Sequence, residues 1–313
     1  MVKKALLGQV SDTDIRLLRV FRAVVECGGF SAAELELNIS RSTISRHIKD
    51  LEIRLGVSLC LRGRGGFALT GDGRHIYDAA LRVLAAIDEF RTQVDDVHHR
   101  LTGTLSIAIF DKTVTNPSAA IGRSLQLFDD MAPAVDIEVY VEPINEIERA
   151  VMDGRFQIGI IPGHRTSTSL DYTHLYNEQM YLYCGHQHRL FAMDKRAISR
   201  RHILDSKYAG LGYHSPNMEI GQRLEMKRRA TAYDQEAIAH LILSGRYVGY
   251  LPSHYAQSFV EQGLMRAIGK KTFQYQCQFN AIIRHSPRPA RVTETFLQAL
   301  KQAHGEGGQT PAR

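Results

Sequence analysis

The fold of the N-terminal part of this chain is decided by residues 30–49, which read Phe-Ser-Ala-Ala-Glu-Leu-Glu-Leu-Asn-Ile-Ser-Arg-Ser-Thr-Ile-Ser-Arg-His-Ile-Lys. Ser31 has a side chain that can cap a helix, and Glu34 follows three residues later, which is the spacing of a capping box. Phe30 and Leu35 have the spacing of a hydrophobic staple around the same cap. We therefore expect a short helix to begin at Ser31.

A second helix is expected after a sharp turn. Asn38 tolerates the left-handed conformation that ends a helix, and Ser40 can cap the next one. Ile44, Ile48 and Leu51 recur at spacings of four and three residues, so they share one buried stripe. The pattern predicts two short helices that meet at a corner, as in a helix-turn-helix that enters DNA.

The side of the second helix that faces away from this stripe carries cations and hydroxyl groups. Hydroxyls, guanidinium groups and the positive N-terminus of a helix all satisfy phosphate oxygens, whereas His47 can reach base edges in the major groove. A solvated basic face is the alternative if charge is considered alone. The residues predicted to bind DNA here are Ser31, Arg41, Ser42, Thr43, Ser45, Arg46, His47 and Lys49.

Residues 55–70 predict a wing beside these helices. Two short apolar runs are separated by a glycine-rich stretch, a pattern typical of a β-hairpin. Arg62 and Arg64 fall near the predicted tip, where they can touch the DNA backbone or minor groove. We add both arginines to the predicted DNA-binding residues.

At this point the chain resembles the LysR-type transcriptional regulators, densely over the first part of the chain and more loosely to its C-terminus. The resemblance is carried by Leu17-Leu18-Arg19-Val20-Phe21, Val24, Gly28-Gly29-Phe30-Ser31, Ile39-Ser40, Ser45-Arg46, Leu51-Glu52, Leu55-Gly56-Val57-Ser58-Leu59, Arg62 and Leu69-Thr70. The resemblance implies that the recognition-helix positions matching Arg41, Ser42, Ser45 and Arg46 contact DNA, as the wing position matching Arg62 often does. Many members have Gln-Pro in place of Arg41-Ser42 and a small residue in place of Glu34, so the operator sequence does not carry over.

Thr70 can cap a long helix that runs to about His98, and the resemblance identifies it as the family's linker helix. Its apolar stripe consists of Ile76, Ala80, Val83, Ala86 or Ile87, and Phe90 to Val94. A long amphipathic helix with no core of its own usually pairs with another, so we expect antiparallel pairing in a homodimer. Packing against its own domain is the alternative. The family resemblance implies a homotetramer on a bipartite DNA site.

The remainder of the chain alternates strand and helix, which predicts a parallel sheet of βαβ units. Expected strands are 105–110, 135–141, 156–161, one within 204–213, 230–233, 247–251 and 273–283; expected helices are 118–131, 144–152, 218–227, 236–244 and 292–303. The fold class is α/β with an N-terminal winged helix-turn-helix, and the resemblance adds a two-lobed effector domain like a type II periplasmic binding protein. The predicted domains are 11–70, 71–99 and 103–304, with lobe I at about 103–180 and 273–304 and lobe II at about 181–272.

In such sheets ligands bind beyond the carboxyl ends of the strands, where helix N-termini point into the cleft. The effector-binding candidates at these ends are Lys112, Thr113, Thr115, Asn145, Gly163, His214, Ser215 and Asp234. An organic anion would use their hydroxyls and cations, but Asp111 and Asp234 favour an amine or a hydroxylated ligand. Ordinary turn and capping roles are the alternative for each of these residues.

Composition narrows the function classes. The formal net charge of +6 suits an anionic partner such as double-stranded DNA. No signal peptide or membrane span is evident, so we expect a cytoplasmic protein. The cysteines Cys27, Cys60, Cys184 and Cys277 are scattered, which favours buried thiols, with a redox response through Cys27 and Cys60 as an alternative.

No catalytic constellation, cofactor motif or metal set is expected, because Cys184-Gly185-His186-Gln187-His188 lacks an evident fourth ligand. A free solute-binding protein would lack residues 1–100 and carry an export signal. The predicted function is therefore a transcriptional regulator whose promoter binding or bending is modulated by a small-molecule effector, with RNA polymerase as a further partner. A DNA-binding regulator without any small-molecule effector is the alternative.

Overall fold

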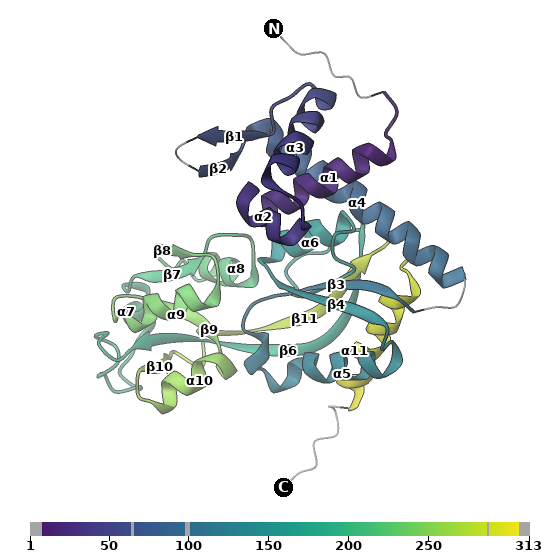
Figure 1. Ribbon diagram of the computed structural model, residues 1–313. Helices are drawn as coiled ribbons and strands as arrows, with labels where there is room; N and C mark the ends of the chain where they lie inside the picture. Colours follow the sequence, from purple (N-terminus) through teal and green to yellow (C-terminus); the bar gives the residue numbers. More distant parts are fainter. Residues whose placement is uncertain (1–7, 64–65, 98–100, 287, 307–313) are drawn as a thin grey trace. The chain divides into compact units, whose positions relative to one another are not determined.

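The structure is a computed structural model that describes residues 8–63, 66–97, 101–286 and 288–306. The chain divides into two compact units, Met1–Val94 and Asp95–Arg313 (Figure 1). Each unit has its own hydrophobic core, so each is described by itself.

The first unit is a winged helix-turn-helix. Its elements are α1 (Asp12–Glu26), α2 (Phe30–Leu37), α3 (Arg41–Leu55), the antiparallel strands β1 (Cys60–Gly63) and β2 (Gly66–Leu69), and most of α4 (Gly71–Val97). Figure 1 shows the three short helices packed on one another and the hairpin projecting beside them. Ile44, Ile48 and Leu51 of α3 are buried in this core, which confirms the predicted stripe.

The turn between α2 and α3 is confirmed, but the predicted start of α2 is wrong. Asn38 adopts the left-handed conformation with φ of 51°, and the Ser40 hydroxyl accepts a hydrogen bond from the Thr43 amide at 3.3 Å. However, α2 begins at Phe30 and its N-cap is Gly29, whose φ of 151° strongly favours glycine. The Ser31 hydroxyl therefore does not cap the helix.

Neither the capping box nor the hydrophobic staple forms. The Glu34 carboxylate instead accepts a hydrogen bond from the Arg41 amide, one of the N–H groups that α3 cannot satisfy within itself. The Leu35 side chain is 91% exposed and cannot act as a staple. The Phe30 ring packs edge-on against Phe67 of the wing, with 5.9 Å between the ring centres.

An ion pair joins α1 to α3. Both Nε and Nη2 of Arg54 donate to the buried Asp14 carboxylate, the second at 2.7 Å from Oδ2. The Ser11 amide and hydroxyl donate to the same carboxylate at 2.8 and 2.6 Å. These bonds, first those from Arg54 and then those from Ser11, lower the pKa of Asp14 to about 2.

The long helix α4 starts as predicted and leaves apolar side chains uncovered. The Thr70 hydroxyl accepts a hydrogen bond from the Gly73 amide at 2.8 Å, which confirms this cap. Ala80 and Leu84 are buried, whereas Val83, Phe90 and Val94 are 40%, 66% and 42% exposed. The predicted end at His98 lies outside the described residues. Among the helices of the described ranges, none combines the length and the apolar character that a bilayer crossing requires.

The second unit contains two α/β lobes, as predicted, with a mixed sheet in place of the predicted parallel one. In lobe I, β3 (Gly103–Ile109) pairs in parallel with β4 (Val135–Val141) and β5 (Ile158–Pro162). Its helices are α5 (Ile121–Met131) and α6 (Ile144–Met152). The predicted helix start at Ser118 is wrong, because Ala120 takes a left-handed conformation and separates a short 3-10 turn from α5.

Lobe II repeats the parallel pattern. Strand β7 (Tyr208–Leu211) pairs with β8 (Arg228–Ala232) and β9 (Val248–Pro252). Its helices are α7 (Arg200–Leu204), α8 (Pro216–Arg223), α9 (Gln235–Leu243) and α10 (Ser253–Glu261). The sequence did not predict α7, α10 or the short strand β10 (Met265–Ile268), which pairs with β6.

Two long antiparallel strands connect the lobes. These are β6 (Leu170–Gly185) and β11 (Gln274–Arg284), followed by α11 (Arg291–Glu306), which packs on α5 (Figure 1). The strand order in this sheet is β4-β3-β5-β11-β6-β9-β7-β8. The antiparallel pair at its centre makes the sheet mixed and carries the chain from one lobe into the other.

We predict that Asp14→Ala destabilises the first unit by about 2 kcal/mol, because it leaves Arg54 without its carboxylate partner. Since the pKa of Asp14 is lowered to about 2 in the folded chain, its contribution is present above about pH 4 and is lost as the pH falls through 2. Hydrogen exchange of amides in α1 and α3 measures the effect locally. The matched control is Asp12→Ala, which removes an exposed carboxylate from the same turn. Equal protection in both variants would contradict a structural role for the ion pair.

Candidate DNA-binding surface and effector cleft

The exposed face of α3 gathers the predicted DNA-binding side chains. Arg41, Ser42, Arg46 and Lys49 are exposed, while Thr43, Ser45 and His47 are half-buried. Because Ile44 and Ile48 hold the opposite side in the core, this face points away from the unit's interior. Ser31 is exposed on the neighbouring helix α2. The face is therefore basic and rich in hydroxyl groups, as binding to phosphates requires.

The remaining DNA-binding predictions concern His47 and the wing. Burial, together with the positive charges of Arg16 and Arg46, lowers the pKa of His47, so its imidazole is neutral at pH 7. A neutral imidazole offers one donor and one acceptor to base edges. Arg62 belongs to β1, but its side chain and the whole of Arg64 lie outside the described part of the chain.

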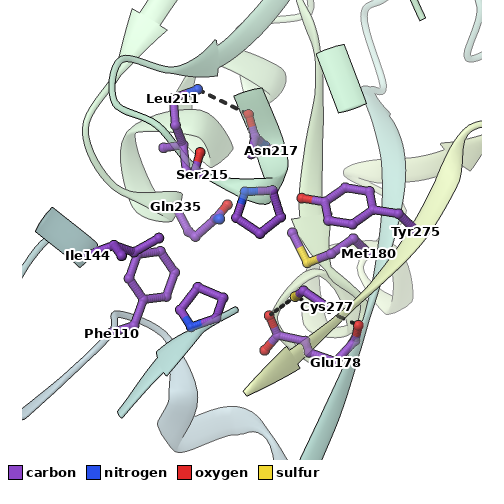
Figure 2. A pocket seen from close by; sticks show the side chains of 12 residues that line it. Phe110, Ile144, Glu178, Met180, Leu211, Ser215, Asn217, Gln235, Tyr275 and Cys277 are labelled. Carbon is purple, nitrogen blue, oxygen red and sulfur yellow. Dashed lines mark hydrogen bonds between the residues drawn. The ribbon is translucent and has the colours of Figure 1, made fainter. Parts of the chain in front are cut away.

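The second unit has a pocket between its two lobes (Figure 2). Phe110, Ile144 and Pro162 reach it from lobe I, and Ser215 and Gln235 reach it from lobe II. Each of these residues lies at the carboxyl end of a strand or just after it, where the doubly wound topology predicts a ligand. The empty space, which includes part that is open to solvent, is about 260 Å³. The pocket therefore lies where this fold class places its small-molecule site.

The crossing strands supply the far wall of this pocket. Glu178 and Met180 come from β6, and Tyr275 and Cys277 come from β11. In the strand register Cys277 is opposite Glu178 and Tyr275 is opposite Met180, so the four side chains form one patch. Sequence reasoning missed all four. The signal was the period-two spacing of Tyr176, Glu178, Met180 and Leu182, in which one carboxylate interrupts an apolar face.

Of the predicted effector-binding residues, Ser215 lines the pocket, and its hydroxyl also caps α8 by accepting from the Met218 amide at 3.3 Å. Asp234 caps α9 by accepting from the Ala237 amide at 2.7 Å. Thr113 is buried, and Asn145 is exposed on the first turn of α6. The Gly163 amide donates to the Gln278 carbonyl at 2.6 Å, so this group is used within the protein.

Three further predicted residues make contacts between the lobes. Lys112 Nζ lies 2.6 Å from Glu236 Oε2. Burial by itself lowers the pKa of Lys112, but the hydrogen bond to Glu236 and neighbouring charges outweigh burial, so the pKa is raised. Thr115 Oγ1 lies 2.7 Å from His254 Nδ1, and His254 Nε2 lies 2.7 Å from Glu178 Oε2. These contacts join loops of lobe I to α9 and α10 of lobe II.

The third interlobe contact is a pair of imidazoles. His214, which follows β7, lies with its ring centre 5.1 Å from that of His164, which follows β5. His164 is held in place by its buried surroundings and lies 3.9 Å from the Glu148 carboxylate. Burial lowers the pKa of His164, although Glu148 opposes the shift. The ring of His164 is therefore neutral at pH 7.

Asp111 places its carboxyl group in the cleft between the lobes. Its Oδ2 accepts a hydrogen bond from the Gln235 amide at 2.7 Å, which links the lobes again. Its Oδ1 is buried and has no hydrogen-bond partner. Burial raises the pKa of Asp111 to about 6, with smaller contributions in the same direction from Asp234 and Glu178.

Two family models match the chain, one within each unit. The model of the bacterial regulatory helix-turn-helix protein, lysR family, matches residues 15–74, and the LysR substrate binding domain matches residues 98–305. The chain belongs to the LysR family of bacterial transcriptional regulators. As a member of the LysR family, it is a DNA-binding regulator with an effector-binding domain and not an enzyme.

Individual LysR-family relatives span nearly the whole chain. The HTH-type transcriptional activator BauR of Pseudomonas aeruginosa is 42% identical over 294 residues, which cover 94% of this chain and 96% of BauR. The crystal structure of CbnR has a TM-score of 0.63 at 16% identity and covers 93% of this chain and 99% of CbnR. CbnR complexed with its target DNA gives a TM-score of 0.61 at 18% identity, covering 92% and 99%. These structural likenesses establish the fold.

The cysteines of this LysR-family chain are free thiols with little exposure. Cys60, Cys184 and Cys277 are buried and Cys27 is partly buried. Burial raises the pKa of Cys184 to about 11 and that of Cys277 well above its usual range, so both thiols stay protonated at pH 7. A protonated thiol is a poor nucleophile, which disfavours a redox role for these two cysteines.

We predict that Asp111→Asn changes how the stability of the second unit depends on pH. An aspartate with a pKa raised to about 6 contributes stability that is present below about pH 4 and lost as the pH rises through 6. The melting temperature of the variant relative to the unmodified chain should therefore rise between pH 4 and pH 7. The matched control, Asp130→Asn on the exposed side of α5, should give a flat difference. A flat difference for Asp111→Asn would show that the carboxyl titrates normally.

Proposed function

We propose that this chain binds promoter DNA through the exposed face of α3 and that a small molecule in the interlobe pocket modulates this binding. The observation that supports DNA binding most directly is the cluster of Arg41, Ser42, Arg46 and Lys49 on one exposed face. Cations and hydroxyls on a helix of this kind position it in the major groove through phosphate contacts. Arg62 and Arg64 are further DNA-binding candidates on the basis of the sequence.

Effector control is proposed to work by population shift. The contacts that cross the cleft include those from Lys112 to Glu236, from Asp111 to Gln235 and from Thr115 to His254. A ligand that binds the closed cleft better than the open one favours the arrangement in which these contacts form. Contacts between protomers would transmit this change and alter the angle between paired winged helices. The altered angle would change the bending of the operator and the access of RNA polymerase to the promoter.

The assembly is proposed to be a homodimer paired through α4, and two dimers form a homotetramer. The exposed apolar side chains of Val83, Phe90 and Val94 support this pairing, because water contact with such a stripe is unfavourable. We further propose that the protein works in the cytoplasm, where a bacterial regulator meets its promoter.

Arg46→Ala is expected to weaken binding to the promoter about tenfold and to reduce the salt dependence of binding by about one ion, because one phosphate or base contact is lost. Gel retardation at several salt concentrations measures both effects. Lys301→Ala removes one exposed cation from α11 in the other unit and should leave affinity unchanged. If Arg46→Ala binds as tightly as Lys301→Ala while circular dichroism shows an intact fold, α3 is not the DNA-binding helix.

Phe90→Glu is expected to shift the chain toward smaller assemblies, because it places a charge within the proposed helix pairing. Light scattering during gel filtration gives the mass of the assembly directly. Phe90→Leu keeps an apolar side chain of similar reach and should retain the mass of the unmodified protein. An unchanged mass for Phe90→Glu would exclude pairing through this stripe.

A further inference from the structure

The interlobe pocket is acidic. Among the residues that line it, Glu178 is the one carboxylate, and burial raises the pKa values of Tyr275 and Cys277. The Glu178 side chain is 5% exposed, and its Oε2 accepts from the Asn116 amide at 3.4 Å and lies 2.7 Å from His254 Nε2. Its Oε1 has a weak donor, the Cys277 thiol, at 3.9 Å. A carboxylate has capacity for about four hydrogen bonds, so Glu178 can still accept from a ligand.

Two amide side chains in the pocket wall have unused hydrogen-bonding groups. Gln235 is 3% exposed and its Oε1 is buried without a partner. Asn217 is 2% exposed, and its Oδ1 accepts from the Leu211 amide at 3.1 Å and from the Tyr208 hydroxyl at 2.9 Å. These two donors fix the orientation of the amide, so Nδ2 of Asn217 is the group that remains unpaired.

The polar groups come from different sides of the pocket. Figure 2 shows the Gln235 amide and the Tyr275 hydroxyl pointing inward from opposite walls, with the Glu178 carboxylate on the side of the crossing strands and Asn217 on the side of lobe II. Buried polar atoms without partners are costly, so a group that pairs with them gains that energy on binding. Gln235 Oε1 and the Glu178 carboxylate are both hydrogen-bond acceptors, so a ligand that binds to them must carry a hydrogen-bond donor.

The lysine of the cleft is paired within the protein. Lys112 pairs with Glu236 and lies over the ring of Tyr255, with 5.3 Å from Nζ to the ring centre. Asp111, next to it in sequence, keeps an unpaired buried Oδ1, and the charges of Asp234 and Glu178 oppose its ionisation. The carboxylates of the cleft therefore repel one another, and a bound cation would relieve this repulsion.

We propose that the effector is a small molecule with a protonated amine, bound by the Glu178 carboxylate and the Gln235 carbonyl, and with a hydrogen-bond acceptor that receives the Asn217 amide. This assignment rests on the proposed function, because it takes the interlobe pocket as the effector site. The aromatic rings of Phe110 and Tyr275 in the wall also favour a cation over an anion. An organic anion would instead place its charge against Glu178.

The test is a series of three small probes that differ in one terminal group: ethanolamine, ethylene glycol and glycolate. Each keeps a hydroxyl for Asn217, while the other end is a cation, a neutral hydroxyl or an anion. In thermal unfolding of the full chain, millimolar ethanolamine should raise the melting temperature of the second unit in a dose-dependent way, whereas the other two should not. A larger shift with glycolate, or no shift with ethanolamine, overturns the amine assignment.

Glu178→Gln locates the binding site. It removes the charge but keeps the shape, and it should weaken ethanolamine binding about tenfold or more, because a charge-assisted hydrogen bond is replaced by a neutral one. The matched control is Glu261→Gln, an exposed carboxylate at the end of α10, which should bind ethanolamine like the unmodified chain. Equal binding by both variants places the amine elsewhere and overturns the proposal.

The outcomes separate this inference from the proposed function. If glycolate binds in place of ethanolamine and Glu178→Gln improves its binding, the pocket remains an effector site but takes an anion. If Glu178→Gln proves too unstable to assay, Gln235→Leu provides a second variant, since it removes the carbonyl proposed to accept from the amine and should also weaken ethanolamine binding. Failure of Arg46→Ala to weaken DNA binding would contradict the proposed function without affecting ethanolamine binding.

Discussion

The second unit depends on the antiparallel pairing of β6 with β11. These two strands run through both lobes, so each lobe is completed by segments that also belong to the other. Their register sets Cys277 opposite Glu178, so one wall of the pocket is formed by strand residues alone. Movement of one lobe against the other must bend or twist these two strands. Their pairing has a register shift between Phe279 and Asn280, which is where the regular hydrogen-bond pattern is interrupted.

Two sites of opposite charge occur in this chain, one in each unit. The exposed face of α3 carries Arg41, Arg46 and Lys49, whereas the cleft gathers Asp111, Glu178 and Asp234. The formal net charge of +6 therefore conceals two different electrostatic environments. One suits a polyanion at the surface, and the other suits a small ligand that is taken out of water.

Local patterns predicted the fold well where a single segment carries the information. The stripe of α3, the caps at Ser40 and Thr70, and the bounds of β4 and α6 all follow from spacing within a few residues. The start of α2 did not follow, because Gly29 adopts its conformation beside Phe67, which is distant in sequence. Three pocket residues, Ile144, Pro162 and Gln235, lie next in sequence to predicted effector-binding residues. The far wall of the pocket depends on strand pairing, which spacing within one segment does not reveal.

The bond between the Glu34 carboxylate and the Arg41 amide bears on how a duplex meets α3. The amide at the tip of a helix is ordinarily free to hold a phosphate oxygen. Here a carboxylate of the protein already accepts from the Arg41 amide, so this backbone group is engaged within the protein. The side-chain cations and hydroxyls of the exposed face, and not this amide, are therefore the groups that can meet a phosphate strand.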